Sequence, residues 1–244
     1  MQLNYKKGEV LLNEEIAKKI FKIKVKGNFN GNPGQFYMLR AWDREPFLSR
    51  PLSIYNLSNK YIEFLYEVKG RGTKIFSNLK SGDFLYLLGP LGNGFNLDIH
   101  GRVGIIAGGI GIAPMIYLAN KLGKQVDFYA GFREEPYSIE EIKYKVNKLY
   151  IATENGCVDH KGYVVDMLNV EKYSQILACG PTPMLKKIVS ICEENHVPAY
   201  ISMENIMGCG IGSCLGCTIE TVNGMKKVCK DGPIFPGEEI VFND

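Results

Sequence analysis

The sequence predicts a β barrel, then an α/β domain with a parallel sheet, then a small cysteine-rich domain, with boundaries at residues 1–99, 100–198 and 199–244. Short β-rich runs separated by Gly, Asn and Pro predict an antiparallel barrel. From Gly101 onward, apolar strands alternate with helical stretches, which predicts a doubly wound parallel sheet. The last segment is too short to hold an apolar core unaided, so we expect bound metal to contribute to its folding.

Each element follows from a local pattern. In the barrel we expect strands at residues 20–25, 34–39, 53–57, 61–68 and 83–88, and an amphipathic stretch at 74–79. In the second domain we expect strands at 103–107, 126–131, 149–153 and 176–179, and helices at 114–122, 139–145 and 183–194. Residues 217–222 and 225–229 predict a hairpin around Asn223-Gly224.

Composition excludes several classes of protein. The chain has 244 residues, of which 45% are hydrophobic and 23% charged, as in ordinary globular proteins. No apolar run approaches the ~20 residues of a membrane span, and the N-terminal residues lack the apolar region of a signal peptide. We therefore expect a cytoplasmic protein without a membrane partner. The net charge of +3 is carried by scattered lysines, which argues against nucleic-acid binding.

The most specific motif is the run C-x4-C-x2-C-x11-C formed by Cys209, Cys214, Cys217 and Cys229. The interspersed glycines allow the tight curl that such a loop needs and expose amides toward the sulfurs. The first three spacings are those of plant-type [2Fe–2S] sites. A four-cysteine zinc site is the main alternative, but such sites usually pair two short knuckles. Unpaired cysteines or disulfides remain further alternatives, although seven cysteines in a cytosolic chain favour thiols and metal ligands.

Two motifs in the barrel suggest a phosphate-containing ligand. Arg50-Pro51-Leu52-Ser53 precedes a strand, and an arginine fork suits a pyrophosphate because its donors bind oxygens in pairs. About 20 residues on, Glu67-Val68-Lys69 is followed by Gly72 and Thr73, where glycine allows amides to face an anion. The alternative for the first motif is a surface arginine beside a turn.

Two further motifs suggest a nucleotide site in the second domain. Gly108, Gly109, Gly111 and Pro114 follow an apolar strand and open a helix, as in turns that hold nucleotide phosphates. Pro114 stands where the third glycine of G-x-G-x-x-G would fall, so a merely tight βα turn stays open. Cys179-Gly180 ends another strand at the expected ligand-binding edge; the alternative is a tight turn before a helix. Acids at Glu134 and Glu135 favour NAD over NADP.

Taken in order, these motifs resemble the ferredoxin-reductase superfamily along nearly the whole chain. The cysteine loop narrows the resemblance to electron-transfer subunits of type B dihydroorotate dehydrogenases. The resemblance implies a ferredoxin-reductase-like fold, with an antiparallel FAD barrel, a parallel-sheet NAD domain and a C-terminal [2Fe–2S] domain, and one FAD and one cluster per subunit.

The resemblance also implies where the cofactors bind. It places FAD at residues 50–53, 67–69, 72 and 73, with Ser53 near flavin N5 and Arg50 on the pyrophosphate. It also places the NAD phosphates beside Gly108, Gly109, Gly111 and Pro114, and the nicotinamide near Cys179 and Gly180. Leu52 stands where many members of the superfamily have an aromatic residue. Cys229 also follows Cys217 much more closely than the fourth cysteine follows the third in a plant ferredoxin.

The resemblance also implies a partner and a reaction. An FMN-containing dihydroorotate dehydrogenase catalytic subunit would pass electrons through the cluster and FAD to NAD+, in pyrimidine (UMP) biosynthesis, as a two plus two heterotetramer. The chain alone should not oxidise dihydroorotate, because no Ser/His/Asp arrangement or proton-abstracting base is recognisable. Alternatives are a flavin/iron–sulfur subunit of a ferredoxin:NADP transhydrogenase, sulfide dehydrogenase or hydrogenase, and a non-enzymatic redox sensor. Four apolar residues could form a docking face or pack on the barrel: Ile206, Met207, Ile211 and Leu215.

Overall fold

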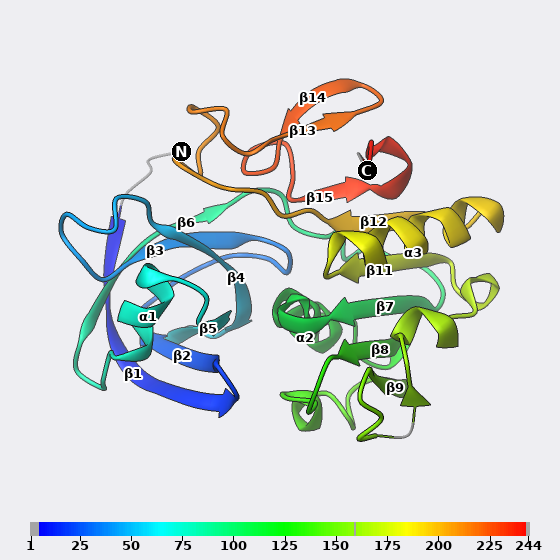
Figure 1. The fold of residues 1–244 in the computed structure, drawn as a ribbon, viewed down its shortest axis with the longest axis horizontal. Helices are drawn as coiled ribbons and strands as arrows, with labels where there is room; N and C mark the ends of the chain where they lie inside the picture. Colours follow the sequence, from blue (N-terminus) through cyan, green and yellow to red (C-terminus); the bar gives the residue numbers. More distant parts are fainter. Residues whose placement is uncertain (1–4, 159, 243–244) are drawn as a thin grey trace.

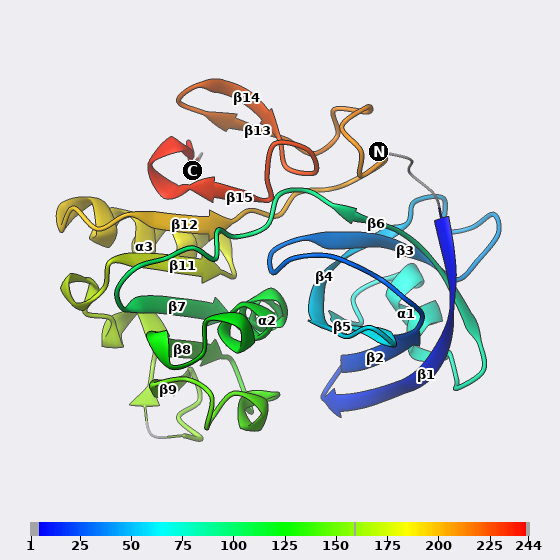
Figure 2. The ribbon, with the colours of Figure 1, turned by 180° about the vertical axis from the view of Figure 1, so that it is seen from behind.

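A computed structural model describes residues 5–158 and 160–242 of the chain. A β barrel and an α/β body lie side by side, and the C-terminal segment crosses above both of them (Figure 1). The view from behind shows helix α2, Ile112–Leu122, between the sheet and the barrel (Figure 2). The predicted fold class, a β barrel followed by a parallel-sheet α/β domain, is confirmed.

The barrel is closed, with strand order β1-β2-β5-β4-β3-β6. Its strands are β1 Tyr5–Ala17, β2 Ile20–Lys26, β3 Phe36–Arg40, β4 Arg50–Leu57, β5 Tyr61–Glu67 and β6 Phe84–Leu91, and helix α1 is Arg71–Ser77. Side chains alternate between the two sides of each strand. In β3, Tyr37 and Leu39 belong to the core inside the barrel, whereas Phe36 and Met38 belong to a core outside it.

Strand β1 was not predicted. It is rich in Lys and Glu, and Val10 is its one fully buried apolar side chain, so its sequence lacks the alternation that marks a half-buried strand. The strand forms because it pairs with both β2 and β6 and thereby closes the barrel.

The α/β body is built on a seven-stranded sheet of order β10-β9-β8-β7-β11-β12-β15. Its parallel strands are β7 Val103–Gly108, β8 Val126–Phe132, β9 Lys148–Thr153, β10 His160–Lys161, β11 Gln175–Cys179 and β12 Ala199–Ser202. Strand β15, Ile234–Pro236, pairs antiparallel with β12. Helix α3 is Thr182–Glu194, and the 3-10 helices are η1 Gly109–Gly111, η2 Gly123–Gln125, η3 Ile139–Glu141, η4 Val164–Met167, η5 Val170–Lys172 and η6 Gly237–Glu239.

The predicted helix at 139–145 is wrong. Only η3 forms there, followed by turns, although Ile139, Ile142 and Val146 are buried at helical spacing. The chain must return at once to the sheet, where Asn147 donates its backbone N–H to the carbonyl oxygen of Val126 at 2.8 Å.

The C-terminal segment does not stand apart from the two larger bodies. Strands β12 and β15 extend the sheet, and the hairpin β13 Thr218–Thr221 and β14 Gly224–Lys227 lies above them (Figure 1). The register pairs Thr221 with Gly224, so the turn is Val222-Asn223, one residue before the predicted one. A common apolar core joins Met38 and Leu88 of the barrel to Val228 of this segment. The predicted domain boundaries stay a prediction.

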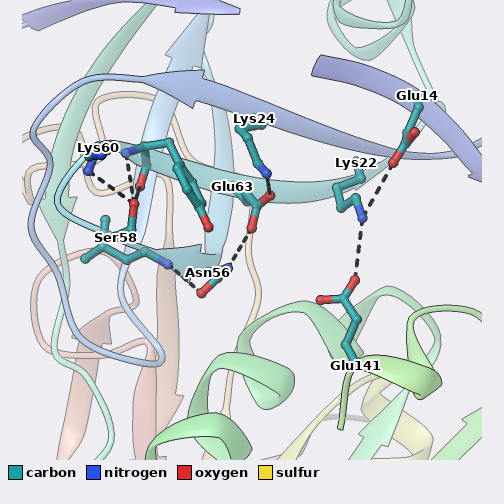
Figure 3. Close-up of polar contacts among 10 residues, drawn as sticks. Glu14, Lys22, Lys24, Asn56, Ser58, Lys60, Glu63 and Glu141 are labelled. Atoms are coloured by element: carbon teal, nitrogen blue, oxygen red, sulfur yellow. Dashed lines mark hydrogen bonds and ion pairs between the residues drawn. The ribbon is translucent and has the colours of Figure 1, made fainter. Parts of the chain in front are cut away.

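Polar contacts also fix the barrel against the α/β body. Lys22 of β2 lies between Glu14 of β1 and Glu141 of η3, at 3.5 Å from each carboxylate (Figure 3). Beside it, the buried Glu63 carboxylate accepts from Lys24 at 2.8 Å and from Asn56 at 2.7 Å (Figure 3). None of the helices within the described residues has the length and apolarity to cross a membrane.

Candidate functional site

The cysteine loop, residues 208–217, brings its thiols together with Cys229 in two pairs. The backbone N–H of Cys209 donates to Cys214 Sγ at 3.4 Å. The thiol of Cys217 lies 3.2 Å from Cys229 Sγ. Cys217 and Cys229 are buried, whereas Cys214 is exposed. One side of the group of thiols therefore faces the interior and the other faces the surface.

Backbone amides of the loop point at the sulfurs. Cys209 Sγ accepts from the amides of Ile211 and Ser213 at 3.4 and 3.3 Å. Cys229 Sγ accepts from the amide of Gly212 at 3.1 Å. Gly212 adopts φ 83°, and this left-handed conformation is the curl that the glycines were predicted to allow.

These donors set the acidity of the thiols. Burial raises the pKa of Cys209, but amide hydrogen bonds outweigh that effect and lower its pKa to about 7. Burial and the neighbouring Cys217 thiol raise the pKa of Cys229 to about 12. The loop thus stabilises the Cys209 thiolate by itself, whereas the Cys229 thiol needs a bound cation to ionise at neutral pH.

The amide donors around the thiols suit an iron–sulfur cluster. Cys209 Sγ accepts from the backbone N–H groups of Ile211, Ser213 and Cys214, and Cys229 Sγ accepts from that of Gly212. Hydrogen bonds to the ligand sulfurs are typical of iron–sulfur sites and tune their reduction potentials.

The barrel presents an arginine that lacks a counter-charge. The Arg50 guanidinium lies 5.5 Å from the Trp42 ring centroid, and its Nη1 donates to the carbonyl oxygen of Leu48. Among the described residues it forms no ion pair, and burial lowers its pKa. A Cβ on Gly72 would lie 2.6 Å from Arg50 Nε, so only glycine lets the guanidinium lie over the start of α1. An anion would balance this charge, and a pyrophosphate fits the fork.

The turn before α1 is shaped by Thr73. Its Oγ1 accepts from the backbone N–H groups of Lys69 at 3.1 Å and Gly70 at 3.2 Å. The Lys69 ammonium pairs with the Glu67 carboxylate at 2.9 Å. The predicted barrel motifs thus meet, because Gly72 joins this turn to Arg50.

The two glycine motifs of the α/β body lie against each other at the carboxyl edge of the sheet. A Cβ on Gly111 would lie 2.5 Å from the carbonyl oxygen of Cys179, and one on Gly180 would lie 3.0 Å from Gly108 Cα. Gly109 has φ 53° and no neighbour within 4 Å of its Cβ position. Pro114 is buried in α2, which begins at Ile112, so the proline is the third helical residue and not the first as predicted.

Sequence reasoning missed two residues beside Cys179. Strand β12 pairs Ser202 with Cys179, and Glu204 follows two residues later. Burial, with Glu204 as a smaller contribution, raises the pKa of the Cys179 thiol. Burial also raises the pKa of Glu204, while Lys69 of the barrel acts to lower it. No sequence motif marks them, because only the pairing of β12 with β11 brings these residues beside Cys179.

These contacts bring the two predicted ligand sites face to face. Lys69 from the barrel lies within electrostatic reach of Glu204 from the sheet edge. Burial, and then the Glu67 carboxylate, raise the pKa of Tyr137 from the α/β body. Glu134 and Glu135 follow β8 and are exposed, beside Cys157, whose thiol donates to the Glu134 carbonyl oxygen at 3.5 Å.

The comparisons with known proteins agree with this geometry. The family model for the iron–sulfur cluster binding domain of dihydroorotate dehydrogenase B matches residues 204–241. The chain is 50% identical to the electron transfer subunit of dihydroorotate dehydrogenase B (NAD(+)) from Clostridium acetobutylicum, and the match covers 100% of both chains. It is 42% identical to the same subunit from Clostridium perfringens, over 99% of this chain and 100% of the relative.

Solved structures show the same fold. An NADH-dependent reduced ferredoxin–NADP oxidoreductase superposes with a TM-score of 0.87 at 28% identity, over 96% of this chain and 89% of that chain. A ferredoxin reductase in carbazole 1,9a-dioxygenase gives a TM-score of 0.71 at 22% identity, over 82% and 69% of the two chains. The resemblance predicted from the motifs is confirmed, and the chain belongs to the family of electron transfer subunits of dihydroorotate dehydrogenase B.

Proposed function

We propose that this protein passes electrons from dihydroorotate, oxidised at the FMN of a catalytic partner subunit, through a [2Fe–2S] cluster and FAD to NAD+, in pyrimidine (UMP) biosynthesis. The proposal rests mainly on one observation: the cysteine sulfurs come together and accept hydrogen bonds from backbone amides, on a loop that packs against the barrel wall. Flavin chemistry suits this position, because a flavin exchanges single electrons with a cluster and a hydride with NAD.

The FAD site is proposed at the barrel residues that face the sheet edge. Arg50 binds the pyrophosphate, and Gly72 keeps the guanidinium in place. Thr73 fixes the turn that contains Lys69. Ser53 of β4 lies three residues along the strand from Arg50, where its hydroxyl can serve the flavin ring near N5. Pro51, Leu52, Glu67 and Val68 complete the proposed contacts.

The NAD site is proposed at the carboxyl edge of the sheet. Gly108, Gly109, Gly111 and Pro114 border the phosphates at the start of α2, where the helix dipole favours an anion. Cys179 and Gly180 border the nicotinamide. The buried Cys179 thiol stays neutral, since burial raises its pKa, so its part is to shape the site and not to act as a nucleophile.

Several finer features belong to the same proposal. The chain divides at residues 1–99, 100–198 and 199–244 into FAD, NAD and cluster domains. It works in the cytoplasm in a complex of two electron-transfer and two catalytic subunits. It oxidises dihydroorotate only with its partner, because its proposed sites serve FAD, NAD and the cluster and leave no second flavin site.

A second candidate is a subunit of a ferredoxin:NADP transhydrogenase. The structural likeness to an NADH-dependent reduced ferredoxin–NADP oxidoreductase favours it, at 28% identity. The 50% identity to a dihydroorotate dehydrogenase B subunit favours the first proposal. The acids at Glu134 and Glu135 would also repel the 2′-phosphate of NADP.

The proposal is tested by steady-state assay of dihydroorotate-dependent NAD+ reduction. The chain is purified alone and co-expressed with a dihydroorotate dehydrogenase catalytic subunit. We expect turnover only in the complex. Turnover by the isolated chain would contradict the division of labour, and an inert complex that still exchanges electrons between ferredoxin and NADP would favour the second candidate.

A further inference from the structure

An uncovered apolar stripe runs along the outer wall of the barrel. In β6, Leu85 and Leu87 point into the barrel core, so Phe84, Tyr86 and Leu88 point outward. Leu88 is buried, but Phe84 is 48% and Tyr86 38% exposed. On β1, Tyr5 pairs with Leu88 and therefore shares its face, with 52% of its surface exposed. Phe84, Tyr86 and Tyr5 form what we call the barrel stripe.

The barrel stripe lies next to the part of the outer barrel wall that the cysteine loop covers. Leu88 pairs with Met38 of β3, and a Cβ on Gly210 of the loop would lie 2.6 Å from Met38. The loop thus covers the Met38 end of this outer wall. In both ribbon views it lies at the end of the barrel where β1 starts (Figure 1, Figure 2). Stripe and loop are one continuous face.

Exposed apolar side chains also lie on the cysteine loop and just before it. Ile206 is 78%, Leu215 61% and Ile211 39% exposed. Met207, by contrast, is 8% exposed and packs into the core, so it does not belong to the face. Leu215 also has φ 60°, a left-handed conformation that is uncommon for residues other than glycine. Exposed apolar side chains grouped in this way are typical of a surface that a partner protein covers.

Charged side chains border this face, and most of them are basic: Tyr86 pairs across the strands with Lys7 and Arg40, and Phe84 pairs with Glu9. The Lys7 ammonium lies 4.0 Å from the Phe84 ring centroid. On the loop side, Lys227 Nζ donates to the carbonyl oxygen of Gly212 at 3.1 Å. A partner that fits this face has an apolar centre and acidic groups at its rim.

We infer that the catalytic subunit docks on the cysteine loop and the barrel stripe together, and not on the loop alone. The inference rests on the proposed function. Electron transfer between cofactors of two chains requires their close approach, so the partner must cover the exposed side of the loop, where Cys214 reaches the surface. A stable interface buries about 800 Å² per partner, more than three loop side chains supply, and aromatic residues typically carry much of the binding energy.

The test measures the affinity of the FAD- and cluster-loaded chain for the catalytic subunit by titration calorimetry. Phe84→Glu combined with Tyr86→Glu should weaken binding at least about tenfold, because the charges would be buried in the interface. Phe84→Thr with Tyr86→Thr is a milder second variant that keeps strand propensity. Tyr144→Glu is the matched control, since Tyr144 is a 79% exposed aromatic outside this face.

Leu215→Gly separates docking from folding. Glycine accepts φ 60° without strain, so this variant should keep its thermal stability and its flavin and cluster absorption while binding the partner about tenfold more weakly. Unchanged affinity of both stripe variants, with Leu215→Gly weakened, would overturn the shared docking face and leave the proposed function standing. Failure of the unmodified chain to bind the catalytic subunit would instead count against the proposed function. A stripe variant that alters only self-association would show that a second copy of the chain covers the stripe.

Discussion

Replacing Gly72 by alanine should weaken FAD binding without weakening the fold. The added Cβ would lie 2.6 Å from Arg50 Nε and 2.7 Å from Cζ, closer than real contacts allow, so the guanidinium must move away from its place beside Trp42. Hydrogen bonds to charged groups contribute about 1.5–3 kcal/mol each. Loss of one such bond to the pyrophosphate corresponds to an affinity roughly 10- to 100-fold lower.

The fold itself should tolerate this change. Gly72 lies within α1, where alanine is favoured over glycine by about 1 kcal/mol. The assay is titration of FAD into flavin-free protein, followed by flavin fluorescence, with thermal unfolding of the flavin-free protein measured in parallel. Gly70→Ala is the matched control, because nothing lies within 4 Å of its Cβ position.

A double-mutant cycle makes the test sharper. If Gly72→Ala acts through the guanidinium, it should have little further effect in an Arg50→Ala background. Equal FAD affinity of Gly72→Ala, Arg50→Ala and the unmodified chain would refute the assignment of Arg50 to the pyrophosphate.

Three further outcomes are expected. Anaerobically purified protein should contain about two irons and two sulfides per chain, and Cys229→Ser should lose or alter the cluster while keeping the flavin; stoichiometric zinc without visible charge-transfer absorption would contradict this. Stopped-flow reduction of the bound FAD should be faster with NADH than with NADPH, because Glu134 and Glu135 repel a 2′-phosphate, and equal rates would remove that argument. Burial raises the pKa of Tyr37 from 10.0 to about 12, so the folded state holds this proton more tightly than the unfolded state; its stabilisation, about 2–3 kcal/mol, is present below pH 10 and should be lost as the pH rises to 12. Urea unfolding across that pH range measures it, and Tyr37→Phe should show a smaller loss.

Much of the fold could be predicted from local patterns, because buried strands such as residues 103–107 are short apolar runs between turns. The observed strand β7 differs from the predicted one only in ending one residue later, at Gly108. Strand β1 could not be predicted, since its pairing on both edges outweighs a polar sequence. The helix expected at 139–145 is reduced to η3, and the turns that follow lead to Asn147, whose backbone N–H bonds to Val126 of β8.

Site residues that belong to one sequence motif could be predicted. Site residues that come together only through tertiary contacts could not. The spacing of Cys209, Cys214 and Cys217 identifies the cysteine loop directly. Glu204 escaped notice because a single acid after a strand carries no motif, and only the pairing of β12 with β11 brings it beside Cys179. The contact between Arg50 and Gly72 likewise joins residues from two elements whose proximity the sequence does not state.

The central claim is that electrons from dihydroorotate reach the cluster and FAD of this chain. It is tested most directly by mixing the anaerobic complex with dihydroorotate in the absence of NAD+ and following the flavin and iron–sulfur absorption. The account predicts bleaching of both the flavin and the cluster bands, and loss of FAD reduction in a complex that carries Cys229→Ser. Reduction confined to the FMN of the catalytic subunit, with the absorption of this chain unchanged, would contradict it.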